Sequence, residues 1–255
     1  MLFLRIAVTI MNASCRLLED DVNSIGYTNV FSSENRELLD RIVVLETMHT
    51  LEIDMASRYT ELIHLPLKVS ALKGDNSPTI TLSQGNVSQA ISLAAEFPES
   101  EIALLVPGNP NGIGYRFMST LTPFEKDVFE SGTLYPILLR LSGLYKQACT
   151  SLNKILFVPD VWFSSHDYVN VIVQPRVVPE TCAEDRFRAV LGFLNERHIN
   201  TLILDPLDWG IVSQDDSIKL NTFVNAISSV SSAKHIICLC SSQDIFNNLY
   251  TLLNH

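Results

Sequence analysis

The sequence predicts an α/β fold in which helices cover both faces of a central sheet, after a helical N-terminal portion. Short, continuous apolar runs such as EIALLV at 101–106 are typical of strands buried on both faces. Amphipathic segments of helical period alternate with these runs in the second half of the chain. Glycine- and proline-containing stretches separate the two kinds of segment, so one domain of alternating strands and helices is expected.

The first 33 residues are expected to form an N-terminal segment, and residues 34–255 a single domain. The opening MLFLRIAVTIM is apolar, which favours a buried strand or short helix. A secretory signal is the alternative, but Arg5 interrupts the apolar run and no small-residue cleavage site follows. From Glu34 to Thr50 the apolar residues recur at helical spacing, with Ser33 placed to cap the helix.

The later elements are predicted from the hydrophobic period, from segment length, and from the turn-forming residues between segments. Residues 68–82 are ambiguous, with two strand-like runs around a Gly-Asp-Asn-Ser-Pro turn. The remaining expected elements are helix 86–97, strand 101–106, helix 133–150, strands 154–163 and 170–175, helix 183–198, strand 201–206, helix 217–229, strand 235–240 and helix 243–253.

Composition excludes several classes of function. The formal net charge is −10 and no Lys/Arg run exists, so the electrostatic footprint of a nucleic-acid-binding protein is absent. No run of about 18 apolar residues occurs, so no membrane span is expected. The five cysteines have no zinc-type spacing, and Cys238 and Cys240 are expected to be core side chains. The odd cysteine count favours an intracellular location, in the cytoplasm or the nucleus.

Ligand sites of such sheets gather at the carboxyl ends of the strands. The stretch 109–136, NPNGIGYRFMSTLTPFEKDVFESGTLYP, follows strand 101–106, and 205–216, DPLDWGIVSQDD, follows the strand that begins at 201. The second loop contains four carboxylates, which oxygen-preferring divalent cations could use. The spacing matches no calcium loop, so a solvated acidic loop is preferred, and neither a metal nor a cofactor is expected. The four residues are Asp205, Asp208, Asp215 and Asp216.

Several blocks in order resemble the bacterial and fungal type of poly(ADP-ribose) glycohydrolase, a branch of the macrodomain superfamily. They are Gly112-Ile113-Gly114-Tyr115, Phe124-Glu125-Lys126, Gly132-Thr133-Leu134-Tyr135-Pro136, Phe157-Val158-Pro159-Asp160-Val161, Val171-Ile172-Val173-Gln174-Pro175, and Leu202-Ile203-Leu204 followed by Asp205-Pro206-Leu207-Asp208-Trp209-Gly210. The resemblance covers roughly residues 34 to 253. It implies a macrodomain-like, three-layer α/β/α fold with a central mixed sheet.

The chain departs from that family at the position of the catalytic acid. There the second glutamate of a Gln-Glu-Glu motif protonates or orients the leaving ribose oxygen. Counted back from Leu134-Tyr135, that position is Lys126, and Glu125 takes the place of the first glutamate. An ammonium group cannot serve as a carboxyl acid, and a lost acid–base group costs about 10²–10⁴-fold in rate. Because this loop is about two residues longer than the family spacing, a register that makes Glu125 the acid stays open.

The ligand-binding loops depart as well. In the family a glycine triplet lets the backbone approach a diphosphate; here Ile113 interrupts it, while Gly112, Gly114 and Tyr115 match. In the second loop Asp205 and Asp208 replace glycines beside Trp209 and Gly210. A carboxylate about 5 Å from a phosphate costs about 3 kcal/mol at an effective dielectric constant of 20. Trp209 could stack on a base, but packing or partner contact is preferred.

Three functions stay open on these residues. The preferred one is a catalytically degenerate macrodomain-like module that binds a protein partner. The second is a glycohydrolase that cleaves ADP-ribosyl linkages with Glu125 as acid. The third is a reader that binds ADP-ribose without cutting it. The matches at Gly114 and Tyr115 favour this function, and the departures at Asp205 and Asp208 oppose it.

Overall fold

The computed structural model describes residues 33–66, 78–97, 101–110, 113, 122–165, 167–176, 180–208, 216–228 and 234–254. By its internal contacts the chain divides into two units, Met1–Thr50 and Leu51–His255. In the first unit the structure describes helix α2 (Ser33–Met48), which agrees with the helix expected from residue 34. The predicted domain boundary at residues 33 and 34 stays a prediction. Within the described ranges, no helix has the length and apolar character needed to cross a membrane.

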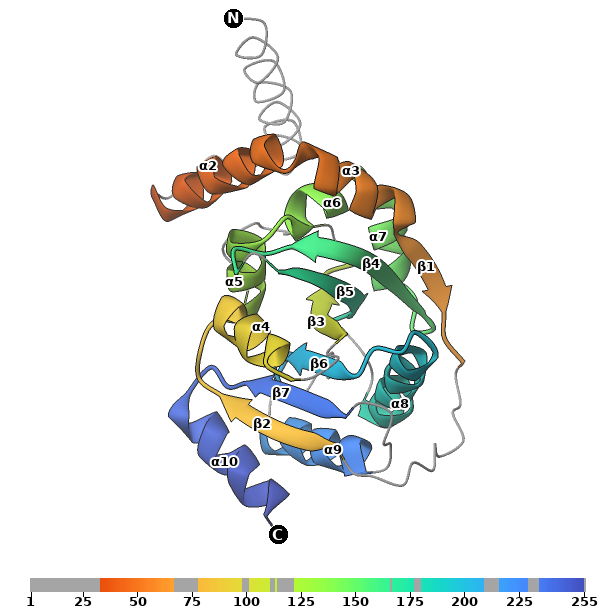
Figure 1. The fold of residues 1–255 in the computed structure, drawn as a ribbon. Coiled ribbons are helices and arrows are strands. Elements are labelled where there is room, and N and C mark those ends of the chain that lie inside the picture. The colour runs from red at the N-terminus through yellow and green to blue at the C-terminus, as the bar shows by residue number, and fades with distance from the viewer. Residues whose placement is uncertain are drawn as a thin grey trace, which may run out of the picture. The chain divides into compact units, whose positions relative to one another are not determined.

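The second unit contains a seven-stranded mixed sheet in the order β1-β4-β5-β3-β6-β7-β2 (Figure 1). Strands β5, β3, β6, β7 and β2 are parallel, whereas β4 runs antiparallel to both of its neighbours, β1 and β5. The strands are β1 (Glu61–His64), β2 (Thr79–Ser83), β3 (Ile102–Gly108), β4 (Lys154–Trp162), β5 (Tyr168–Pro175), β6 (Thr201–Leu204) and β7 (His235–Leu239).

Helices cover both faces of this sheet, so the predicted α/β class and mixed sheet are confirmed (Figure 1). One face carries α8 (Glu180–Glu196), α9 (Asp216–Ser228) and α10 (Gln243–Leu253). On the other side α4 and α7 contact the strands, and α5 and α6 join them. The remaining helices of this unit are α3 (Thr50–Tyr59), α4 (Val87–Ala95), α5 (Pro123–Ser131), α6 (Leu134–Arg140) and α7 (Ser142–Cys149).

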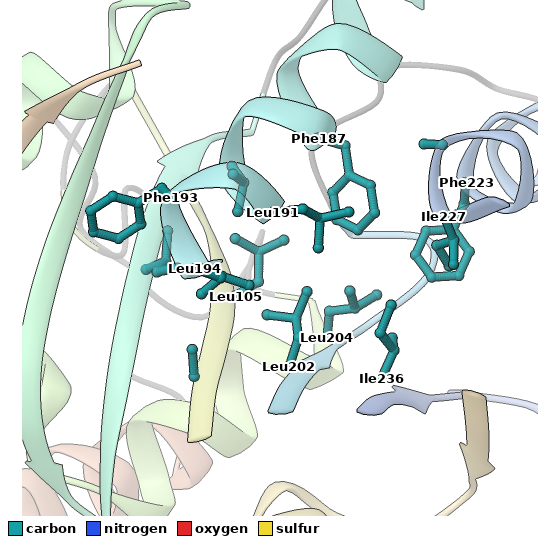
Figure 2. Close-up of a cluster of buried hydrophobic side chains, with 14 of the residues drawn as sticks. Leu105, Phe187, Leu191, Phe193, Leu194, Leu202, Leu204, Phe223, Ile227 and Ile236 are labelled. Atoms are coloured by element: carbon teal, nitrogen blue, oxygen red, sulfur yellow. The ribbon is translucent and has the colours of Figure 1, made fainter. Parts of the chain in front are cut away.

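The main core lies between the sheet and α8 and α9. Figure 2 shows Leu105 of β3 and Leu202 and Leu204 of β6 pointing toward Phe187 of α8 and Phe223 of α9. Intervening residues of these strands are also buried, on the opposite face of the sheet. The strands are therefore apolar throughout because both faces are covered. Cys238 and Cys240 belong to this core, as predicted.

The structure corrects the expected element list in three places. The single helix expected over 133–150 is two helices, because the backbone leaves the helical region at Leu141 (φ −108°, ψ 25°), ahead of Ser142-Gly143. The segment that carries Glu125 is helix α5, not loop. Helix α3 and strand β1 were not expected at all. The strand-like run at 68–72 lies outside the described residues.

Candidate functional site

Three neighbouring parallel strands end at the same edge of the sheet. Strand β3 lies between β5 and β6, and its last residue, Gly108, is in register with Pro175 at the end of β5. The connection after β3 leads to β4 on one side of β3, whereas the connection after β5 leads to β6 on its other side, and such a switch point is where open α/β sheets bind ligands. Asn109, Arg176 and Asp205 follow directly after β3, β5 and β6. The candidate site is therefore this carboxyl edge.

Helix α5 brings Glu125 to this edge through its N-terminal cap. The Glu125 N–H donates to Thr122 Oγ1 (3.2 Å), and Glu125 Oε2 accepts from the Thr122 N–H (3.0 Å) and hydroxyl (3.4 Å). This reciprocal pair is a capping box, and Pro123 occupies the first turn. The sequence Thr-Pro-Phe-Glu carries the signature of such a cap. The cap was not among the predictions, in which Glu125 was only a candidate acid.

Arg176 connects Glu125 to the loop after β6. Its Nη1 lies 3.2 Å from Glu125 Oε2, and its Nη2 lies 3.7 Å from Asp208 Oδ1. Its backbone N–H donates to the carbonyl oxygen of Gly108 (2.9 Å), which fixes the residue beside the end of β3. Sequence reasoning did not select Arg176. The available signal was a basic residue directly after a buried strand.

Burial dominates the electrostatics of both carboxylates. It raises the pKa of Glu125, although the Thr122 hydrogen bond and the Arg176 charge act in the opposite direction. Burial also raises the pKa of Asp208, against a hydrogen bond from Thr122 and the charge of Arg176. Each carboxylate therefore has a partner, yet the pKa of each lies above its ordinary value.

Asp205 has a structural role in the second loop. Its Oδ1 accepts from the Leu207 N–H (2.7 Å), and its carbonyl oxygen accepts from the Asp208 N–H (3.1 Å), so the side chain closes a turn. The residue is buried, and this burial raises its pKa to about 7. At neutral pH Asp205 is thus partly protonated, and Asp208 is paired with Arg176. An anion near this loop is therefore repelled less strongly than it would be by the two full negative charges expected from the sequence.

Of the other predicted site residues, the structure describes Lys126. Lys126 lies on the exposed side of α5 and pairs with Glu130 one turn later (3.7 Å), whereas Glu125 lies on the buried side. Of the glycine loop, only Ile113 is described. Five of the candidate ligand-binding residues lie outside the described ranges: Gly112, Gly114, Tyr115, Trp209 and Gly210.

Helix α7 supports the end of β3 through Tyr145. The buried Tyr145 hydroxyl accepts a hydrogen bond from the Asn109 N–H (2.8 Å). Burial raises the pKa of the Tyr145 phenol, and it raises that of the neighbouring Cys149 thiol to about 12. A thiol in this state is no nucleophile at neutral pH. Among the described residues, no group of three or more His, Cys, Asp or Glu could hold a metal ion.

Comparison by sequence and comparison by structure give different results. No protein-family model and no curated protein matches this sequence. Among solved structures, the poly(ADP-ribose) glycohydrolase from Thermomonospora curvata superposes with a TM-score of 0.66 at 13% identity, covering 88% of this chain and 99% of that chain. The same protein bound to the inhibitor ADP-HPD gives 0.65 at 13% identity, over 88% and 99% of the two chains.

A second organism gives the same result. The poly(ADP-ribose) glycohydrolase from Deinococcus radiodurans in complex with ADP-ribose superposes with a TM-score of 0.63 at 16% identity, over 79% of this chain and 96% of that chain. These identities establish a likeness of fold. The fold predicted from the loop and strand motifs is confirmed, and the chain has a poly(ADP-ribose) glycohydrolase-like macrodomain fold.

Proposed function

We propose that this chain is a catalytically degenerate glycohydrolase-like macrodomain that acts as a protein-interaction module. One observation carries the loss of catalysis: the two candidate acid positions are both unsuited to the role. Glu125 is bound by the Thr122 cap and by Arg176, and Lys126 points to the exposed side of α5.

The chemistry of glycosidic cleavage explains why this matters. A general acid must hold a proton and present it to the leaving oxygen in the transition state. Glu125 Oε2 instead accepts from the Thr122 N–H and contacts a guanidinium, so this oxygen is engaged within the protein, although burial raises the pKa of the carboxyl. Lys126 carries no carboxyl group. Rate losses of about 10²–10⁴-fold are expected from losing such a group.

A hydrolysis assay tests this proposal directly. Purified protein is incubated with poly(ADP-ribose), and free ADP-ribose is measured by chromatography. We expect no release above the blank. The proposal of degeneracy fails if ADP-ribose is released by the unmodified protein and by Glu130→Gln, but not by Glu125→Gln. Glu130→Gln is the matched control because Glu130 lies on the same helix and forms a surface ion pair with Lys126.

The proposed partner surface is the outer face of α3. Three large apolar side chains, Leu51, Met55 and Tyr59, lie one turn apart and are 77%, 50% and 61% exposed. The opposite side of the same helix buries Ile53 and Ala56. A helix that is apolar on both sides has more apolar surface than its own fold covers, which is typical of a face that a partner protein covers.

This part of the proposal has its own test. We expect a partner protein to co-purify with the unmodified chain and to crosslink to α3. This partner should no longer co-purify with the Met55→Asp variant. It should be retained with Tyr250→Asp, which places the same charge at an exposed large apolar side chain on α10. Equal retention by both variants would exclude α3 as the interface.

A glycohydrolase with Glu125 as acid is the second candidate. The raised pKa of this buried carboxyl favours it, because a general acid works best with a pKa near the working pH. Calorimetry with ADP-ribose, together with the release assay, distinguishes the hydrolase from a reader and from the interaction module. Binding with release supports the hydrolase, binding without release supports a reader, and no binding leaves the interaction module.

A further inference from the structure

Strand β2 forms one outer edge of the sheet, with β7 as its neighbour in the described part of the chain (Figure 1). The Thr79 N–H donates to the carbonyl oxygen of Lys234, the residue directly before β7 (2.9 Å). Backbone groups alternate in direction along a strand, so Ile80 and Leu82 direct theirs away from β7. Strand β2 therefore presents the N–H and C=O groups of these two residues along an open edge.

Strand β2, which is described over its whole length, carries no charge, no proline and no bulge. Such features normally keep an edge strand from pairing with another chain. Its sequence is TITLS, and its register with β7 is regular. The opposite edge of the sheet is different, because β1 has four residues and its Glu61 forms an ion pair with Arg197 (2.6 Å). Strand β2 is therefore the edge that is open to a further strand.

The elements around β2 are poor in charge, although the chain as a whole is acidic. Between Asp75 and Glu96 the sequence contains no Asp, Glu, Lys or Arg, and this stretch includes β2 and α4. Helix α10 contacts β2 and has Asp244 as its one charged residue. Two copies of a chain with a net charge of −10 repel each other, and they do so least where charged side chains are missing. Charge therefore does not oppose the approach of a second copy at this edge.

We propose that two copies of this chain associate through β2, with the two strands antiparallel about a two-fold axis at Thr81. In this register Ile80 lies opposite Leu82 of the second copy, so their outward N–H and C=O groups form hydrogen-bonded pairs. Thr81 lies opposite itself and Thr79 lies opposite Ser83, so each hydroxyl side chain meets another hydroxyl side chain. Ile80 and Leu82 pack against the core beneath α10, and their pairing continues that apolar layer into the second copy. Each side chain meets its own kind, as a two-fold interface requires.

The size of the contact sets the kind of dimer. A strand of five residues offers a small interface, so the association is reversible rather than permanent. The fraction of dimer must then depend on protein concentration.

Sedimentation velocity over a series of protein concentrations measures the association. We expect the unmodified protein to shift from monomer to dimer as its concentration rises. Thr81→Lys places two like charges opposite each other, so the Kd of the dimer should rise about tenfold or more. Thr150→Lys is the matched control: it adds the same charge at an exposed threonine at the end of α7, and the Kd should not change.

A mixture of variants tests the position of the two-fold axis. Thr81→Glu alone should weaken the dimer as Thr81→Lys does. An equimolar mixture of the two variants should dimerise about as tightly as the unmodified protein, because opposite charges then face each other. The inference is overturned if the unmodified protein stays monomeric at every concentration, if Thr81→Lys dimerises as tightly as Thr150→Lys, or if the mixture stays monomeric.

Hydrogen exchange on the unmodified protein replaces the variants if they fail to fold. The outward amides of Ile80 and Leu82 should exchange more slowly as the protein concentration rises, whereas the amides of β1 should not change. Equal exchange of the β2 amides at low and high concentration would also overturn the inference.

This inference goes beyond the proposed function and does not depend on it. Pairing through β2 needs neither hydrolysis nor the outer face of α3. Met55→Asp, which tests α3, should leave the Kd of the dimer unchanged. Failure of the β2 pairing would likewise leave the hydrolysis assay and the α3 test unaffected.

Discussion

Replacing Asp205 with asparagine should stabilise the protein at alkaline pH. The carboxyl group is buried at the end of β6, and its pKa is raised from 3.8 to about 7, first by burial and also by Asp208, with Lys219 acting in the opposite direction. Between these two values the folded state binds a proton that the unfolded state has released. The stability from this group is thus fully present below about pH 4 and is lost as the pH rises to about 7.

The magnitude follows from the size of the shift. A difference of about three pKa units at 1.36 kcal/mol per unit gives about 4 kcal/mol as an upper limit. Asparagine does not titrate, and its Oδ1 can still accept the Leu207 N–H that closes the turn. We therefore expect Asp205→Asn to unfold like the unmodified protein near pH 4. At pH 8 its free energy of unfolding should be higher by up to about 4 kcal/mol.

Urea unfolding at several pH values between 4 and 8, followed by circular dichroism, measures this difference. Asp216→Asn is the control, because it removes the same charge from an exposed side chain. The reasoning is refuted if Asp205→Asn loses as much stability between pH 4 and pH 8 as the unmodified protein does. It is also refuted if the variant gains its stability equally at all pH values.

Three further substitutions test the support of the site. Gly108→Ala should lower the free energy of unfolding by about 1–3 kcal/mol, because the new Cβ would overlap Cys149 Sγ and lie 2.9 Å from Val173 Cγ1; Cys149→Ala in the same chain should recover part of the loss in urea titrations, since it removes the first overlap and leaves the second. Tyr145→Phe removes the acceptor of the Asn109 N–H, and a loss of about 1–3 kcal/mol is expected in the same titrations. Lys126→Ala breaks an exposed ion pair between residues one turn apart. Its free energy of unfolding should therefore differ from that of the unmodified protein by no more than about 0.5 kcal/mol.

Most of the sheet could be predicted because its strands are buried on both faces. A continuous apolar run such as EIALLV has no other stable place in a chain of this kind. The break at Leu141 could not be predicted from period alone, since apolar positions continue in phase through it. Strand β1 was missed because a four-residue edge strand, ELIH, carries too few residues to show alternation.

The site was predicted less completely, for a physical reason. Motif comparison selects positions by residue type, and so found Glu125, Asp205 and Asp208. It could not show that Arg176 lies between two of them, because an ion bridge joins segments that are far apart in the chain. Nor could it show that Asp205 is buried and partly protonated near neutral pH. Burial raises the pKa of carboxylates, so some of them carry less than a full negative charge. The charge counted from the sequence then overstates the electrostatic repulsion at the site.

Glu125, the glutamate that most resembles a catalytic acid, has a structural reason to be where it is. With Thr122 it forms the capping box of α5, and such caps stabilise a helix by about 1 kcal/mol whatever chemistry occurs nearby. Its presence is therefore no evidence for hydrolysis. Lys126, the next residue, has no such role in the helix; its side chain is exposed and makes one loose pair. A carboxyl group stands where the helix needs an acceptor, and none stands at the position where the resemblance places the acid. That contrast is the one expected under the proposed loss of catalysis.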